Sequence, residues 1–178
     1  MTAIPVLQGE RVRLREHRVD DLEAYAALWS NEEVVRFIGG KPLGRDDCWG
    51  RILRTRGMWA ILGFGFWIIE DRRTGVLIGE AGLMDMKREI EPSLDGTIEA
   101  GWALLPAVHG QGFAGEAMRL VLDWGDRNLP GVPQSCIVSE GNEPSLQLAA
   151  RLGFTRSGRG TYRDATLIHF RRAAFSSR

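Results

Sequence analysis

The sequence has 178 residues, of which 44% are hydrophobic and 26% are charged, as in an ordinary globular protein of one domain. Basic and acidic residues number 23 each, and this balance argues against nucleic acid or an anionic membrane as the main partner. The first residues lack the apolar core of a signal peptide, and no apolar run approaches the roughly 20 residues that span a bilayer. We therefore expect a cytoplasmic protein with a single domain over residues 1–178.

The cysteines and histidines do not follow a metal-binding pattern. Cys48 and Cys136 are far apart, no C-x-x-C pair occurs, and the three histidines are scattered. We predict no metal site and two buried, reduced thiols.

The first third of the chain is predicted to begin with a strand and to continue as helices. Residues 11–15 alternate polar and apolar side chains, which predicts an opening strand with one face in solvent. Asp20 and Asp21 are suited to cap a helix whose apolar residues recur at helical spacing. A short helix over 31–38 and a longer one over 45–62 follow. The buried side of the longer helix is expected to carry Trp49, Ile52, Leu53 and Trp59.

The remaining elements alternate between strands and helices. The predicted strands cover residues 64–70, 76–84, 97–104, 135–139, 154–159 and 167–171. The turn-forming sequence DRRTG joins the first two of these strands, which is typical of a hairpin. The predicted helices cover residues 115–128 and 144–152. The pattern indicates an α/β protein with a single mixed, mostly antiparallel central sheet flanked by helices.

The stretch HGQGFAGEA, residues 109–117, contains a literal G-x-G-x-x-G motif. In a dinucleotide-binding domain this motif follows the first strand directly, and an acidic residue about 20 positions later holds the ribose. Here the motif lies in the second half of the chain, after a short loop, and the expected acidic position is near Ser135. This context argues against an NAD-dependent oxidoreductase.

The chemistry of the loop nevertheless suits a phosphate-bearing ligand. Glycines let the backbone approach a ligand closely. Backbone N–H groups at a helix N-terminus attract an anion, which the helix dipole stabilises further. A pyrophosphate group meets these requirements, and a glycine-rich turn without a ligand is the alternative.

A second motif lies downstream of the loop. Asn142-Glu143-Pro144-Ser145 is followed, after a short amphipathic helix, by Leu152-Gly153-Phe154. Together with His109-Gly110-Gln111-Gly112-Phe113-Ala114, this pattern resembles the GNAT superfamily of acetyl-CoA-dependent N-acetyltransferases. In that family a [Q/R]-x-x-G-x-[G/A] loop binds the coenzyme A pyrophosphate, and an N-x-x-S motif precedes L-G-F.

The resemblance extends over most of the chain. LQGERVRLREHRVDDLEAYAALWSNEEVVRFIGG resembles the start of the RimJ/RimL-type branch, which acetylates amino groups, including protein N-termini. GVLIGEAGL resembles the third strand of the fold, and IEAGWALLPAVHGQGFAGEA resembles its fourth strand and phosphate loop. The resemblance implies the GNAT fold, in which the fourth and fifth strands are splayed apart. It also makes a homodimer a family-level expectation.

The resemblance implies how acetyl-CoA would be bound. The pantetheine arm would pair, like an added strand, with the backbone of Trp102, Ala103 and Leu104. The pyrophosphate would be received by His109, Gly110, Gln111, Gly112, Phe113, Ala114 and Gly115. Asn142 and Ser145 would line the coenzyme near the thioester. The implied reaction is direct attack of a primary amine on that thioester in a ternary complex.

Two residues depart from the family pattern. His109 replaces the usual glutamine or arginine, which weakens a side-chain contact but leaves the following backbone amides unaffected. Ala149 stands four residues after Ser145, where many members carry a tyrosine that protonates the leaving thiolate. Ser145 is therefore the candidate acid, as the resemblance to RimL-like enzymes also implies.

Glu99 is the candidate general base. Alternation places it on the same strand face as Ala103, and a carboxylate inside an apolar strand needs a partner or a purpose. A structural ion pair is the alternative role. Glu80 and Asp85 are rival bases, whereas Glu116 in the first helical turn is expected to complement the helix dipole.

The favoured function is an N-acetyltransferase that transfers the acetyl group of acetyl-CoA to an amine of a protein N-terminus, a peptide or a small molecule. The alternative is a non-catalytic acyl-CoA-binding module of the same fold. The missing tyrosine favours this alternative, whereas Asn142 and Ser145 disfavour it. No motif in the first two helices or in the loop over residues 85–95 specifies the acceptor.

Overall fold

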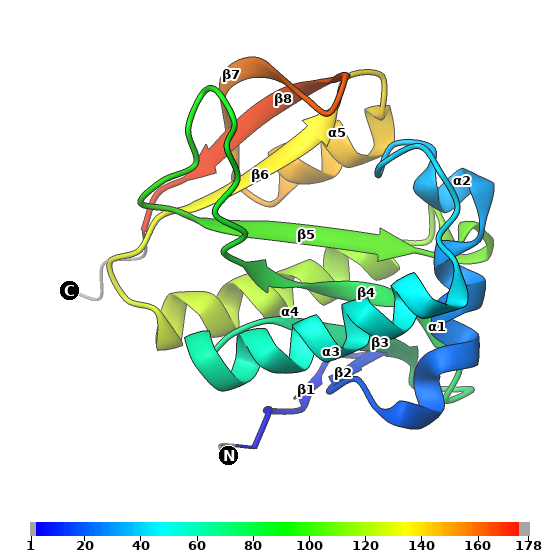
Figure 1. Ribbon diagram of the computed structural model, residues 1–178. Coiled ribbons are helices and arrows are strands. Elements are labelled where there is room, and N and C mark those ends of the chain that lie inside the picture. The colour runs from blue at the N-terminus through cyan, green and yellow to red at the C-terminus, as the bar shows by residue number, and fades with distance from the viewer. Residues whose placement is uncertain (1–2, 175–178) are drawn as a thin grey trace. The chain divides into compact units, whose positions relative to one another are not determined.

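The computed structural model describes residues 3–174. Its strands form an eight-stranded mixed sheet in the order β1-β2-β3-β4-β5-β6-β8-β7, flanked by helices (Figure 1), which confirms the predicted fold class. Contacts within the chain divide it into two compact units, one of residues up to 82 with 102–121, the other of 83–101 with 122 onward. The single-domain organisation stays a prediction.

The first unit is built on antiparallel strands. β1 (Leu7–Gln8) pairs with β2 (Val12–Arg15), β2 pairs with β3 (Phe66–Asp71), and β3 pairs with β4 (Leu77–Met84). The predicted hairpin is therefore confirmed. The predicted opening strand is confirmed as β2, but β1 precedes it because residues 7 and 8 fold back onto β2. β5 (Ile98–Leu104) ends in this unit.

Four helical segments follow β2 in the first unit: η1 (Val19–Asp21), α1 (Leu22–Trp29), α2 (Glu32–Val35) and α3 (Arg45–Leu62). The bounds of α3 agree with the prediction, whereas α2 is shorter than expected. The side chain of Asn31 caps α2 by accepting hydrogen bonds from the first-turn amides.

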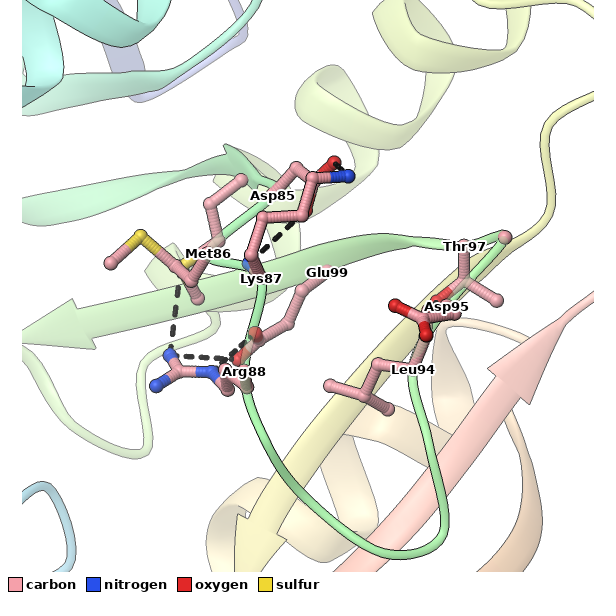
Figure 2. A pocket seen from close by; sticks show the side chains of 10 residues that line it. Asp85, Met86, Lys87, Arg88, Leu94, Asp95, Thr97 and Glu99 are labelled. Atoms are coloured by element: carbon pink, nitrogen blue, oxygen red, sulfur yellow. Dashed lines mark hydrogen bonds and ion pairs between the residues drawn. The ribbon is translucent and has the colours of Figure 1, made fainter.

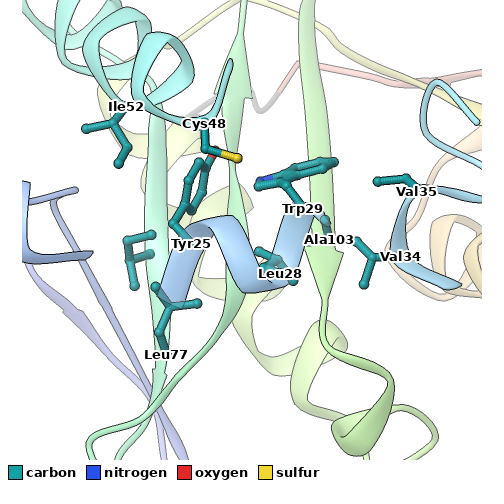
Figure 3. Packing of buried hydrophobic residues seen from close by; sticks show 10 residues of the cluster. Tyr25, Leu28, Trp29, Val34, Val35, Cys48, Ile52, Leu77 and Ala103 are labelled. Carbon is teal, nitrogen blue, oxygen red and sulfur yellow. The ribbon is translucent and has the colours of Figure 1, made fainter. Parts of the chain in front are cut away.

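The core of the first unit lies between α1, α3 and the strands (Figure 3). Tyr25, Leu28 and Trp29 of α1 pack with Ile52 of α3. The cluster is completed by Val34, Val35, Cys48, Ile68, Leu77 and Ala103. Because Ile68 and Leu77 belong to β3 and β4, the two helices cover one face of these strands.

Three predictions about the first unit are wrong. The strand over residues 11–15 does not have one face in solvent, because Arg15 is 5% exposed and donates hydrogen bonds to Asp21 and Glu70. Asp21 therefore uses its carboxylate on Arg15 and does not cap α1. Leu53 is 52% exposed and lies outside the core, because the covered side of α3 runs through Cys48, Ile52 and Thr55.

The second unit contains the remaining strands. β6 (Gln134–Ser139) pairs antiparallel with β8 (Ala165–Arg172), which pairs antiparallel with β7 (Thr155–Tyr162), and the three lie side by side in Figure 1. The predicted final hairpin is thus confirmed, with longer strands than expected. α5 (Glu143–Arg151) joins β6 to β7. Cys136 on β6 and Cys48 in the first unit are both buried free thiols, as predicted.

β5 and β6 are the strands that the family resemblance counts as fourth and fifth. They are connected through α4 (Phe113–Asn128) and pair in parallel at Ile98 and Glu99, opposite Gln134 and Ser135. Their splaying further along stays a prediction.

Candidate active site

The glycine loop runs from the end of β5 into the N-terminus of α4. Gly110 and Gly112 have φ values of 71° and 84°, in the left-handed region that glycine enters without steric cost. The Gly112 carbonyl accepts a hydrogen bond from the Glu116 amide at 3.1 Å, so helical bonding already begins here. α4 therefore starts two residues before the predicted Gly115, which brings its unpaired first amides into the loop.

Two side chains of the loop fold back onto its own backbone. An imidazole N–H of His109 donates to the Leu104 carbonyl over 2.8 Å, and the Gln111 side-chain amide donates to the Ala107 carbonyl over 2.9 Å. His109 therefore connects the loop to the last residue of β5. The predicted place of His109 in coenzyme binding is a separate role and stays a prediction.

Glu116 joins the start of α4 to the start of β2. Its carboxylate accepts hydrogen bonds from the backbone amides of Arg11 and Val12 at 2.7 and 3.2 Å, and from the Arg11 guanidinium at 3.0 Å. Burial alone would raise the pKa of Glu116, but these donors lower it overall. An ionised carboxylate in the first turn agrees with the structural role expected for Glu116.

The strand backbone expected to pair with the pantetheine arm is packed closely on one side. Leu105 donates its amide to the Ile78 carbonyl at 2.9 Å, which ties the end of β5 to β4. A side chain at Gly79 would place a Cβ 2.3 Å from the Ala103 carbonyl oxygen, so only glycine fits there. Trp102, Ala103 and Leu104 remain the predicted pantetheine contacts.

Glu99 is buried in the second unit and ion-paired. It is 6% exposed, and the Arg88 guanidinium donates to both carboxylate oxygens, at 2.7 and 3.2 Å (Figure 2). Burial raises the pKa of Glu99, and the pull of Arg88 in the opposite direction does not cancel this effect. Asp85 also raises the pKa of Glu99. A carboxylate with a raised pKa is a better proton acceptor than an ordinary one.

A small cavity lies beside Glu99. Its volume is about 30 Å³, which exceeds the roughly 10–15 Å³ that one water needs. The loop residues on either side of Arg88 and Asp95 form most of its wall (Figure 2). The Glu99 carboxylate therefore has space for water next to it, in addition to its ion pair.

The rival base Glu80 is held in its ionised form within the first unit. His17 and Tyr25 hydrogen-bond to one carboxylate oxygen at 3.1 and 2.8 Å, and Arg51 binds the other at 3.0 Å. Burial by itself would raise the pKa of Glu80, but the hydrogen bond from His17 and the charge of Arg51 lower it to about 2. Such a weak base is unsuited to take a proton from an amine.

Replacing Glu80 with glutamine is expected to lower the free energy of unfolding by about 3 kcal/mol at pH 7, because the Arg51 charge loses its buried partner. A lowered pKa stabilises the folded state only where the unfolded carboxylate is ionised. The difference between wild type and variant should therefore be complete above the ordinary pKa of 4.5 and disappear as the pH falls toward 2. Urea unfolding across this range measures it.

The exposed ion pair of Glu23 with Arg45 provides the control, since Glu23→Gln should change stability by less than about 1 kcal/mol at any pH. A difference between wild type and Glu80→Gln that stays constant from pH 7 to 2 would contradict the assigned pKa of Glu80.

Asn142 and Ser145 lie at the N-terminus of α5. The Asn142 side chain caps this helix by accepting a hydrogen bond from the Ser145 amide at 3.4 Å. The N-cap of α5 is therefore Asn142. Ala149 is fully buried, so a tyrosine could not replace it without displacing its neighbours.

Asp85, the remaining rival base, is paired with Lys87 at 2.7 Å and is partly exposed. Within residues 3–174, no group of three or more potential ligand side chains could hold a metal ion. Over the same residues, no helix is both long and apolar enough to cross a bilayer.

Sequence reasoning missed several partners of these residues. Arg88 pairs with Glu99, Arg11 with Glu116, and Arg51 with Glu80. No local pattern distinguishes these arginines from the others in the chain, because each partner is distant in sequence. Only the carboxylate of Glu99, inside an apolar strand, indicated that such a partner was needed.

A strand that runs into a glycine loop and then into a helix N-terminus, as in the first unit, is suited to a phosphate-bearing ligand. The family model for the acetyltransferase (GNAT) domain matches residues 11–155. The chain therefore belongs to the GNAT acetyltransferase family, which confirms the resemblance and the predicted activity.

Individual relatives agree with this assignment. A GnaT-family acetyltransferase from Bordetella pertussis is 30% identical, with a TM-score of 0.84 over 96% of this chain and 100% of that one. The N-acetyltransferase YoaA of Bacillus subtilis (strain 168) is 28% identical over 86% of this chain and 85% of its own length. The ribosomal L7/L12 alpha-N-protein acetyltransferase RimL, solved in complex with coenzyme A, is 14% identical with a TM-score of 0.79, covering 97% of this chain and all of that one. This last likeness concerns the fold.

Proposed function

We propose that the protein transfers the acetyl group of acetyl-CoA to a primary amine by direct attack in a ternary complex. The observation that carries this proposal is the loop at residues 109–115, where two left-handed glycines precede a 16-residue helix at the end of a strand. Its amides offer the donors that a pyrophosphate needs. The family's use of acetyl-CoA and the coenzyme A complex of RimL support the same ligand.

In the proposed reaction the amine nitrogen attacks the thioester carbon. A C–N bond forms, the C–S bond breaks, and the coenzyme leaves as a thiolate. Glu99 accepts the proton that the amine loses, directly or through a water in the adjacent cavity. Ser145 donates a hydrogen bond to the sulfur as its negative charge develops.

The acceptor class in this proposal is an amine of a protein N-terminus, a peptide or a small molecule, as in the RimJ/RimL-type branch. A cytoplasmic location and a homodimer belong to the same proposal by that resemblance. A panel of amines and N-terminal peptides, assayed for thiol release from acetyl-CoA, tests it. Release that depends on the acceptor is expected. Coenzyme A binding without release for any amine would instead support the non-catalytic acyl-CoA-binding module.

Replacing Ser145 with alanine is expected to lower kcat by roughly 10- to 150-fold. The lost interaction is a hydrogen bond to a developing charge, worth about 1.5–3 kcal/mol in the transition state. Coenzyme affinity should change less, because the thioester sulfur is uncharged before the reaction. Steady-state kinetics with the best acceptor and calorimetry with coenzyme A give the two values.

Ser145→Thr is the matched control, since it keeps the hydroxyl and should retain most of the turnover. The helix itself should remain intact in Ser145→Ala, because the cap is the Asn142 side chain and its bond goes to the backbone. A Ser145→Ala enzyme with full turnover would refute the catalytic role.

A further inference from the structure

Arg11, which directly precedes β2, connects this strand to the glycine loop. Its Nη1 donates a hydrogen bond to the Gln111 carbonyl at 2.7 Å, and its guanidinium lies 4.8 Å from the centre of the Phe113 ring. Its Nη2 would be 3.2 Å from a Cβ built at Gly112. The guanidinium therefore contacts Gln111 and Phe113 and lies next to Gly112.

Glu116 fixes the orientation of this guanidinium. One carboxylate oxygen binds the backbone amides of Arg11 and Val12, and the other binds the Arg11 Nε at 3.0 Å. Both the backbone and the side chain of Arg11 are thus held by one carboxylate from α4. This leaves Nη1 directed at the Gln111 carbonyl and Nη2 next to Gly112.

Holding the Gln111 carbonyl also fixes the following amide. In a planar trans peptide, the carbonyl and the N–H of the next residue point in opposite directions. Because Arg11 binds the Gln111 carbonyl, the N–H of Gly112 points away from Arg11. A glycine at this position would otherwise let the peptide rotate, since Gly112 populates φ values of either sign at similar cost.

We propose that Arg11 is a positioning residue for the coenzyme, which turns the Gly112 amide toward the pyrophosphate by holding the preceding carbonyl. The inference rests on the proposed binding of the pyrophosphate by this loop. Arg11 acts through the backbone, and its positive charge also favours an anion nearby. The Glu116 carboxylate offsets part of that charge, so the main effect is the orientation of the peptide.

The test compares two ligands, of which only one contains the pyrophosphate. Coenzyme A carries it together with the 3′-phosphoadenosine part, whereas pantetheine has the thiol arm alone. Calorimetry gives the dissociation constant of coenzyme A, and an NMR titration gives that of pantetheine. In Arg11→Met the dissociation constant of coenzyme A should rise about tenfold, as for one hydrogen bond to a charged group. That of pantetheine should stay within about twofold.

Arg45→Met is the matched control, because Arg45 is also an exposed arginine paired with a glutamate of the same unit. It should leave both dissociation constants unchanged. If Arg11→Met does not fold, Arg11→Lys carries the test, since lysine keeps the charge but not the fork that reaches both Glu116 and Gln111. A rise of about threefold for coenzyme A alone is then expected.

An equal rise in the dissociation constants of both ligands would overturn the inference, since it would mean that Arg11 only supports the fold. Unchanged coenzyme A affinity in a folded Arg11→Met protein would overturn it as well. Failure of the wild-type protein to bind coenzyme A would instead refute the proposed function. The two failures are therefore distinguishable.

Discussion

Replacing Glu99 with glutamine is expected to lower kcat by about 10²–10⁴-fold, the range for losing a general base. Glutamine keeps the size of the side chain and can still accept a hydrogen bond from Arg88, but it cannot take a proton. Coenzyme A affinity should change little, because the predicted coenzyme contacts are other residues. Steady-state kinetics as a function of pH is the appropriate measurement, since the acid limb set by Glu99 should disappear in the variant.

Glu140→Gln is the matched control for this experiment. Glu140 is also bound through both oxygens by an arginine, Arg159, but the pair is exposed. Its replacement should leave kcat unchanged. A Glu99→Gln protein that loses stability but retains wild-type turnover would assign Glu99 to a purely structural ion pair with Arg88.

Replacing Gly112 with valine is expected to weaken coenzyme A binding by about 10²–10⁴-fold. A β-branched side chain is strained at a φ of 84°, and its Cβ would lie 3.2 Å from Arg11 Nη2. The loop should therefore change conformation and lose two or more hydrogen bonds to the pyrophosphate, each worth about 1.5–3 kcal/mol. Calorimetry with coenzyme A measures the loss.

Gly75→Val is the control that separates an effect specific to the glycine loop from the general effect of backbone strain. Gly75 has a φ of 72° in the hairpin between β3 and β4, and a Cβ added there would have no atom of the described residues outside its immediate neighbours within 4 Å. It should suffer a similar backbone penalty while keeping its coenzyme affinity. Unchanged affinity in a folded Gly112→Val protein would refute the assignment of the loop as a pyrophosphate site.

The elements were predictable where short-range signals are strong. The predicted and observed bounds agree most closely for α3, and the turn DRRTG was sufficient to place the β3–β4 hairpin. The start of α4 was missed because Gly115 was expected to begin the helix, whereas helical bonding begins at Gly112. Glycine near a helix start is compatible with either arrangement, so the sequence alone does not distinguish them.

The chemistry of the site was only partly predictable. An acidic residue in an apolar strand correctly indicated that Glu99 needs a partner, but the sequence did not indicate whether the pKa values of Glu99 and Glu80 would rise or fall. That direction depends on the number of donors that converge on each carboxylate. Glu80 receives them from three different segments of the chain, whereas both hydrogen bonds to the Glu99 carboxylate come from the one side chain of Arg88. Such convergence is a property of the folded chain.

The pKa values of these two carboxylates are shifted in opposite directions, so inactivation and denaturation by acid are expected at different pH values. As the solution is acidified, Glu99 is neutralised at a higher pH than Glu80, because burial raises its pKa. Glu80 keeps its charge until the pH approaches 2, so the contacts between α1, α3 and β4 persist. An enzyme that uses Glu99 as its base would stop working on acidification while Glu80 is still charged, and would resume on neutralisation without having to refold.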